Sequence, residues 1–339
     1  MFNFALKLMK HYLYIVIAVI WFLGMMSACS NETDEGSMLD FSEVKGKPIE
    51  FDFKGITEEY GITRSTALPT SVTVWVTTDA GEHWYPYIWD NDKKLWKPKS
   101  TAVKWTSKTM TIYAAVRGDL TDDTWSNTFT IKSDQGLLEN LLKSDFLGAR
   151  QHATYTSGRI SMTLQHRVAR LVVLAQVGAN DSKANLLTCQ TNTSQISMHN
   201  AAAVAGTAVY PITGTISCGN NNVDVLANVQ STETVGEEEI TYFSKEDPQY
   251  YNVFNLYKDN NIVPTEIDNV SGLDNNRTAV FVAYFLDMGL GKIQPGLKFT
   301  YLKNQTYYEL APLITLEQGG IGVEKGRTSC ITIFMPALP

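Results

Sequence analysis

The side chains most able to do chemistry in this sequence are few and widely spaced. Its histidines never occur at the short intervals that a metal site needs, and no HExxH, GxSxG or GxxxxGK[ST] pattern is present. Asp90-Asn91-Asp92 begins like a calcium loop but lacks the later Gly and Glu that would close one. We therefore expect no catalytic residue, metal site or cofactor. The five histidines are His11, His83, His152, His166 and His199.

Three further groups of residues have both a chemical and a structural interpretation. His166 lies in a long strand-like run, where a structural histidine bonded to the backbone is expected. Residues 83–96, HWYPYIWDNDKKLW, are rich in aromatics and favour a β-hairpin, with a sugar-binding platform on Trp84 and Trp89 as the alternative. Cys189 and Cys218 either pair or remain buried free thiols.

The first residues have the features of a targeting segment. Lys7 and Lys10 precede an uncharged apolar run over 12–26, which is too short for a typical spanning helix. The run leads into Met26-Ser27-Ala28-Cys29, which resembles the lipobox of bacterial lipoproteins. This resemblance implies removal of residues 1–28 and acylation of Cys29 with fatty chains such as palmitate, which would anchor the protein to the outer membrane.

The stretch after Cys29 differs in composition from the rest. Residues 29–45 include SNETDEGS, which is polar and acidic, and this predicts a flexible tether. Acidic residues placed directly after the lipidated cysteine also resemble the surface-export signal of Bacteroidetes lipoproteins.

Length and charge limit the possible classes. Removing the leader leaves 339 − 28 = 311 residues, which suggests two domains. The polar stretch after Val177 places the boundary between them after residue 178, so the predicted domains are 46–178 and 179–339. The leader holds two lysines and no acids, so the mature chain has 28 − 2 = 26 basic and 35 acidic side chains, a net charge of −9. This balance gives no support for a nucleic-acid partner.

The mature chain is predicted to be all-β with a minor helix. Short β-rich runs separated by Gly, Asn, Asp and Pro indicate antiparallel β-sandwiches. One helix is predicted at 136–147, with Leu137, Leu138, Leu141 and Leu142 on one face that would pack against strands. The expected strands are 48–53, 71–77, 109–116, 127–131, 159–177, 194–198, 207–217, 250–257, 278–286, 297–302 and 329–335.

Taken together, several segments resemble a known family. A lipobox leader and a short strand precede a loop with Thr63-Arg64-Ser65, and a Trp-x-Pro stretch then leads into TMTIYAAV at 109–116. ISMTLQHRVARLVV at 160–173 is the most specific piece, and GLKFTYLKNQTYYEL and GGIGVEKGRTSCITI follow near the C-terminus. Together these are similar to the fimbrillin family, the type V pilins and related surface lipoproteins of Bacteroidetes, over most of the mature chain.

The resemblance implies a fold and an assembly mechanism. It implies two tandem transthyretin-like β-sandwich domains, and a protease that cuts the loop after the first strand, here between Arg64 and Ser65. Loss of the first strand would open a groove in the N-terminal domain, and a C-terminal strand from another fimbrial subunit would fill it. The partners would then be other subunits, in a homo- or hetero-polymer.

The residues are compatible with this mechanism. Removing Pro48–Phe53 would uncover a sheet edge and the pocket that holds Ile49, Phe51 and Phe53, and an open edge recruits a replacement strand. The last strand offers Ile331, Ile333 and Met335 with a period of two, after a glycine-rich stretch that would let it swing out. The alternative is that it simply closes the second domain.

Three functional hypotheses follow from these features. The first is a structural subunit of a cell-surface fimbria that supports adhesion. The second is a fimbrillin-like lipoprotein that is never cut and stays in the outer membrane as an anchor. The third is a surface lipoprotein that binds a host or glycan ligand through the aromatics at 84–96. An enzyme is not expected, because no catalytic constellation is visible.

Overall fold

The computed structural model describes most of the chain from residue 41 to residue 335. It comprises two compact units, residues 1–44 and 45–339, and in the first only the short helix α2 (Phe41–Val44) is described. The described residues are 41–55, 71–78, 83–120, 124–155, 158–197, 210–219, 222–227, 231–235, 238–242, 250–251, 254–267, 270–286, 292–312, 321–322 and 325–335.

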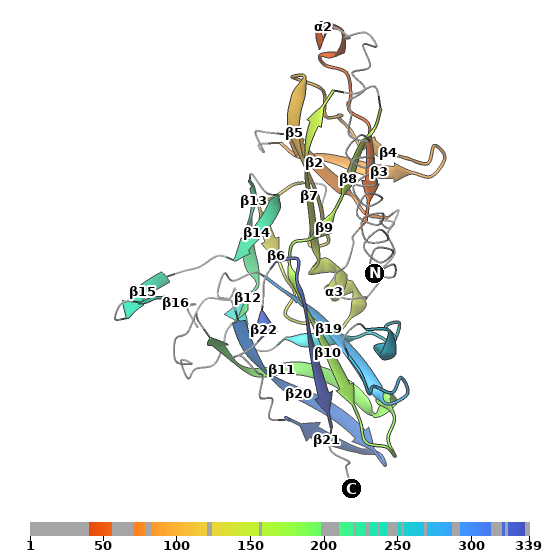
Figure 1. Ribbon diagram of the computed structural model, residues 1–339, viewed down its shortest axis with the longest axis vertical. Helices are drawn as coiled ribbons and strands as arrows, with labels where there is room; N and C mark the ends of the chain where they lie inside the picture. Colours follow the sequence, from red (N-terminus) through yellow and green to blue (C-terminus); the bar gives the residue numbers. More distant parts are fainter. Residues whose placement is uncertain are drawn as a thin grey trace, which may run out of the picture. The chain divides into compact units, whose positions relative to one another are not determined.

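The second unit is built mainly of β-strands, which confirms the predicted all-β class (Figure 1). The helical elements among its described residues are α3 (Leu138–Lys143) and the 3-10 turns η2 (Lys183–Asn185) and η3 (Pro264–Glu266). The strands of the first half are β1 (Phe51–Lys54), β2 (Val74–Thr78), β3 (Tyr85–Asp90), β4 (Leu95–Pro98), β5 (Thr109–Arg117), β6 (Thr128–Thr130), β7 (Phe146–Thr154), β8 (Ile160–Thr163), β9 (Gln165–His166) and β10 (Ala169–Gln176). Those of the second half are β11 (Leu186–Ser197), β12 (Tyr210–Pro211), β13 (Thr213–Cys218), β14 (Val223–Ala227), β15 (Ser231–Val235), β16 (Glu238–Tyr242), β17 (Tyr250–Tyr251), β18 (Asn255–Lys258), β19 (Thr278–Phe285), β20 (Lys292–Lys303), β21 (Thr306–Leu310), β22 (Ile321–Gly322) and β23 (Thr328–Phe334).

The first half forms a six-stranded antiparallel sheet in the order β4-β3-β2-β5-β7-β9. The aromatic stretch at 83–96 is the β3–β4 hairpin, as predicted, and Asp90 accepts hydrogen bonds from the amides of Asp92 and Lys93 in its turn. Trp84 and Trp96 are buried, and Trp84 stacks on Trp125 at a centroid distance of 3.9 Å. Because its ring is covered, Trp84 offers no exposed platform for a sugar.

The second half forms a larger sheet in the order β21-β20-β11-β18-β19-β10-β23, with β22 paired to β20. The expected N-terminal domain, 46–178, includes β10, but β10 pairs with β19 on one edge and with β23 on the other. All eight residues of β10 are buried, and a strand buried on both faces needs partners along both edges. We therefore assign β10 to the later sheet, while the tandem division of the chain stays a prediction.

The predicted long strand at 159–177 and the predicted helix at 136–147 both require correction. The strand is divided into β8, β9 and β10. The helix is only α3, which ends before Ser144, whose hydroxyl donates to the Asn140 carbonyl and accepts from the Lys132 amide. Of its leucines, Leu141 is buried, whereas Leu137, Leu138 and Leu142 are exposed. The chain after the helix forms β7, because Phe146 and Leu147 enter the core.

A third sheet joins residues from the two halves of the chain. Strand β13 pairs with β14 in a hairpin, and its other edge pairs with β6. The hydroxyl of Tyr113 on β5 donates to the Gly219 carbonyl at 3.2 Å. Gly148 on β7 lies so close to β14 that a Cβ atom would meet the Val223 carbonyl oxygen at 2.8 Å. The β13–β14 hairpin is therefore held against the six-stranded sheet by close backbone contact.

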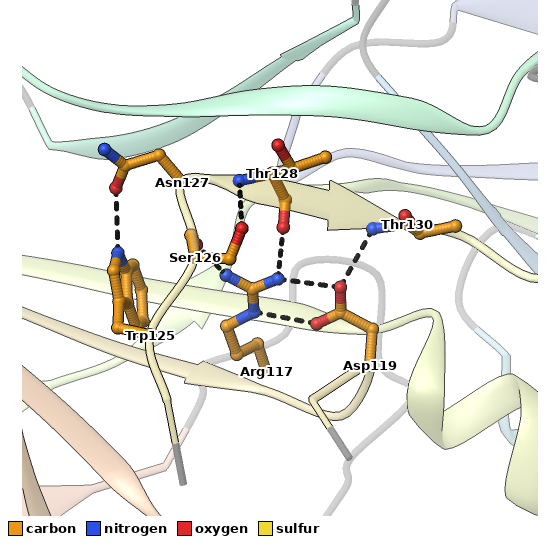
Figure 2. A network of polar contacts seen from close by, with 7 residues as sticks. All are labelled: Arg117, Asp119, Trp125, Ser126, Asn127, Thr128 and Thr130. Atoms are coloured by element: carbon orange, nitrogen blue, oxygen red, sulfur yellow. Dashed lines mark hydrogen bonds and ion pairs between the residues drawn. The ribbon is translucent and has the colours of Figure 1, made fainter. Parts of the chain in front are cut away.

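A buried ion pair fixes the start of β6 (Figure 2). The Arg117 guanidinium contacts both oxygens of Asp119, at 2.7 Å each, and also donates to the carbonyls of Ser126 and Thr128. Asp119 in turn accepts from the Thr130 amide at 2.9 Å. The Arg117 and Asp119 side chains are 1% and 6% exposed. Because every polar group has a partner, the pair closes the loop from β5 to β6 without an uncompensated charge.

Replacing Asp119 by Asn should destabilise the protein strongly. The change leaves the buried Arg117 charge without a carboxylate, and loss of one partner of a buried ion pair costs about 3–5 kcal/mol. The measurement is the free energy of unfolding in urea. Asp52→Asn is the matched control, because Asp52 and Lys54 form an exposed pair at 3.7 Å that should contribute less than about 1 kcal/mol. Equal losses in the two variants would contradict the assignment.

Candidate functional site

The residues predicted for strand exchange fall into two described segments. Ile49, Phe51 and Phe53 lie on and next to β1, and Ile331, Ile333 and Met335 lie on and next to β23. The predicted lipidation residue Cys29 and the predicted cleavage residues Arg64 and Ser65 lie outside the described residues. The site is therefore built from the two strands and from the residues around them.

The first strand lies between two other segments of backbone. On one edge, the Ile49 amide donates to the Val103 carbonyl at 2.8 Å, and the Trp105 amide donates to the Lys47 carbonyl at 3.0 Å. On the other edge, β1 runs parallel to β8, and the amides of Ile160 and Leu164 donate to the carbonyls of Glu50 and Lys54. Residues 46–54 therefore satisfy hydrogen-bonding groups on both neighbours.

The inward side chains of this segment fill an aromatic pocket. Ile49, Phe51 and Phe53 are 3%, 1% and 5% exposed. The Phe51 and Phe53 rings are stacked at 5.2 Å, Phe51 meets Tyr87 edge-on at 5.2 Å, and Phe53 meets Trp96 edge-on at 5.6 Å. Burying each such side chain stabilises the protein by about 1.5–3 kcal/mol. The strand thus contributes a substantial part of this local core.

The outward side chains contribute little. Glu50 and Lys54 are exposed, and the Asp52 side chain is 47% exposed, as the alternation of a strand with one solvent face requires. Glu50 pairs with Arg159 at 3.3 Å, but both side chains are exposed, and such pairs contribute about 0–1 kcal/mol. The strand is held by its backbone and by its inward side chains.

Tyr87 connects the pocket to the backbone beside it. Its buried hydroxyl accepts a hydrogen bond from the Val103 amide at 2.9 Å. Burial raises the pKa of Tyr87 to about 12, because the phenolate is poorly solvated there, although the bond from Val103 acts in the opposite direction. Tyr87 therefore positions the 103–105 segment on which the first strand lies.

The last strand lies at the edge of the large sheet. β23 pairs with β10 in parallel register, from Arg170 opposite Thr328 to Gln176 opposite Phe334. Ile331, Ile333 and Met335 are buried, whereas Cys330 and Phe334 are exposed. Within the part of the chain that the structure describes, no strand pairs with its other edge. β23 is thus an amphipathic edge strand held by one neighbour.

The first and last strands share a pattern and a mode of pairing. Each presents three apolar side chains at alternate positions, and each runs parallel to its neighbour, β8 for β1 and β10 for β23. Such an arrangement performs no covalent chemistry. It can recognise another strand, with the backbone providing hydrogen bonds and the alternate pockets setting the register.

The remaining predicted groups have structural roles. The Nδ1–H of His166 donates to Oδ1 of the Asp145 carboxylate at 2.6 Å, a bond to a side chain that the sequence did not predict. Cys189, Cys218 and Cys330 are free thiols, and burial raises the pKa of Cys189 well above its ordinary value. The described residues contain no cluster of metal-ligating side chains.

Among those same residues, no helix is both long and apolar enough to cross a membrane.

Some residues of the site were missed by the sequence analysis. Tyr87 and Trp96 line the pocket. Val103 and Trp105 belong to the extended 103–105 segment that bonds to the first strand and forms the rim of the pocket. The alternation Val103-Lys104-Trp105, buried-exposed-buried, is a detectable signal for that rim. No comparable local signal exists for Arg117 and Asp119, because their burial depends on the carbonyls of a later segment.

A comparison with protein families identifies the class of this chain. Residues 66–279 match the family model described as Fimbrillin-like, and the chain belongs to this family. It is accordingly a structural protein and not an enzyme. Membership of the family supports the assignment of the chain as a subunit of a cell-surface fimbria. No curated protein matches the sequence.

Several solved structures are similar to this one. A candidate cell adhesion protein from Bacteroides ovatus is 13% identical with a TM-score of 0.46, covering 86% of this chain and 94% of its own. A fimbrial assembly protein from Parabacteroides distasonis is 9% identical with a TM-score of 0.32, covering 84% and 90%. The fimbrial anchor protein Mfa2 from Porphyromonas gingivalis is 10% identical with a TM-score of 0.26, covering 78% and 81%. The family assignment rests on the family model.

Replacing Tyr87 by Phe should weaken the rim of the pocket. The buried Val103 amide loses its acceptor, which costs about 1–3 kcal/mol. The raised pKa also predicts a pH effect. The neutral phenol favours the folded state, so its contribution is present below pH 10.0 and is lost as the pH rises to about 12.

The free energy of unfolding, measured at neutral pH and across this alkaline range, tests both effects. Tyr307→Phe is the control, because Tyr307 is 68% exposed. An alkaline loss of stability that is identical in wild type and Tyr87→Phe would contradict the role of Tyr87.

Proposed function

We propose that this chain is a fimbrial subunit that assembles by exchange of strands. In this proposal the protein reaches the outer membrane as a lipoprotein acylated on Cys29, and a protease cuts between Arg64 and Ser65. The cut releases β1 with its lipid, and the C-terminal strand of a neighbouring subunit takes the place of β1. The resulting fibre supports adhesion.

The observation that carries the proposal is the position of residues 46–54. They lie between the 103–105 segment and β8, and they fill a pocket whose other walls come from β3 and β4. Once these residues leave, the backbone groups and the apolar pocket that they cover are exposed to water. An exposed edge next to an apolar pocket favours binding of another amphipathic strand.

The properties of β23 support it as the strand that is donated. It is an edge strand with one described neighbour, and its inward residues follow the same alternation as those of the first strand. A strand at a sheet edge leaves without breaking two ladders. Both β1 and β23 lie outside the matched family range of 66–279, so their geometry supports this part of the proposal separately from the family match.

An uncut anchor is the second candidate. It is favoured by the full set of contacts that β1 makes within its own chain, since a strand with two bonded edges and three buried side chains is stable in place. The two candidates differ in the first residue of the surface protein. Ser65 is expected for a cut subunit and acylated Cys29 for an anchor, and sequencing the N-terminus of the surface form distinguishes them.

Replacing Arg64 by Ala should leave a folded, lipidated monomer that does not join fibres. The change removes the side chain at which the protease would cut, and it lies outside both strands of the proposed exchange. Electron microscopy and gel filtration of surface extracts measure assembly. Arg159→Ala, at an exposed pair, is the control and should assemble normally. Normal fibres from Arg64→Ala would remove Arg64 from the mechanism.

Truncation before Ser329 should produce a subunit that accepts a strand but donates none. Mixed with cut wild-type subunits, it should end growing fibres, so that mean fibre length falls as its fraction rises. The measurement is fibre length by electron microscopy. Fibres of unchanged length at a high fraction of the truncated chain would exclude β23 as the donor.

A further inference from the structure

Asp224 lies at a junction that the proposed function does not explain. It is on β14 of the β13–β14 hairpin, which is held against β5, β6 and β7 by the contacts described above. Its carboxylate is only 16% exposed. One oxygen, Oδ1, accepts from Nε of Arg167 at 3.0 Å and from its Nη2, and the other, Oδ2, accepts from Nζ of Lys325 at 2.7 Å.

The two cations belong to the segments that lead into two adjacent parallel strands. Arg167 comes two residues before β10, and Lys325 comes three residues before β23. The strands run in parallel register, so both segments enter the sheet at the same end. A single carboxylate from a hairpin outside that sheet therefore binds the start of both strands.

The two ion pairs differ in the number of contacts and in the exposure of the cation. Arg167 is 12% exposed, contacts Asp224 through two nitrogens, and also donates to the Val223 carbonyl at 3.1 Å. Lys325 is 37% exposed and reaches Asp224 through one nitrogen. If Lys325 leaves, Asp224 keeps Arg167 as a partner and is not left as an uncompensated buried charge. The second pair is thus the one that can be broken at low cost.

The backbone turns sharply between Lys325 and β23. Gly326 has a φ of +69°, and a Cβ atom there would lie 2.8 Å from the His166 carbonyl oxygen, so a residue with a side chain would be strained. Its amide donates to the Val168 carbonyl at 3.2 Å, and the Arg170 amide donates to the Arg327 carbonyl at 2.9 Å. These bonds and the Lys325–Asp224 pair together hold the first residues of β23 in place.

We propose that Asp224 is the fixed half of a latch whose releasable half is Lys325, and that this latch controls how readily β23 leaves its own sheet. Asp224 stays paired with Arg167 while Lys325 separates with the departing strand. The hairpin that carries Asp224 is anchored on the six-stranded sheet, so the latch connects that sheet to the donor strand. The consequence for fibre assembly rests on the proposed function, whereas the latch itself is a property of the single subunit.

Hydrogen exchange of the intact, uncut chain tests the latch without any fibre. In Lys325→Gln, backbone amides of β23 should exchange about two- to five-fold faster than in wild type, as expected from losing a partly exposed ion pair. Amides of β5 and β7 should be unchanged. Lys325→Arg should restore the wild-type rate. Lys298→Gln is the matched control, because it breaks a similar pair with Glu309, between β20 and β21, near the edge of the same sheet that lies opposite β23.

The outcomes separate the latch from the proposed function. Unchanged exchange in β23 of Lys325→Gln, or an equal increase in Lys298→Gln, overturns the latch. Faster exchange limited to β23 supports it, and assembly of the cut variant that is also faster by about two- to five-fold supports both proposals. Faster exchange in β23, together with normal assembly of the chain truncated before Ser329, supports the latch and overturns β23 as the donor strand.

Discussion

Every peptide N–H and C=O along a β-strand needs a hydrogen-bonding partner, and this requirement determines how the first and last described strands, β1 and β23, are held. The first strand satisfies groups on the 103–105 segment and on β8 at once. The last strand satisfies one edge of β10, whose other edge is paired with β19. Because each end completes a surface that would otherwise be exposed, each is a place where a strand from another molecule can act.

The frame around these strands is held by contacts that do not depend on them. The Arg117–Asp119 pair closes the loop into β6 (Figure 2). The buried Gln135 side chain donates to the Tyr284 carbonyl and accepts from the Tyr284 amide, both at 2.8 Å. These are the two hydrogen bonds that a neighbouring strand would make with Tyr284 of β19. These polar contacts give the buried Arg117, Asp119 and Gln135 side chains hydrogen-bonding partners away from both terminal strands.

Membership of the fimbrillin-like family indicates a structural protein and not an enzyme, and the geometry of β1 and β23 likewise favours recognition of a strand. Recognition of a strand needs a defined edge, alternate pockets and a supply of edge strands, and it does not need catalytic side chains. The pocket for the first strand is aromatic, with Tyr87 and Trp96 against Phe51 and Phe53. Aromatic contacts depend on ring geometry, which makes such a pocket selective for the side chains that enter it.

Local patterns in the sequence were sufficient for the β class, for the β3–β4 hairpin, and for the inward alternation of Ile49, Phe51 and Phe53 and of Ile331, Ile333 and Met335. These features depend on neighbours within a few residues, through the two-residue period of a strand and the chemistry of turns. The tertiary structure alone decided that β10 joins the later sheet, that α3 buries only Leu141, and that Asp224 binds both Arg167 and Lys325. The strand pairing and the ion pairs join residues far apart in the sequence, such as Arg170 and its register partner Thr328, which are 158 positions apart, where no local period exists to relate them.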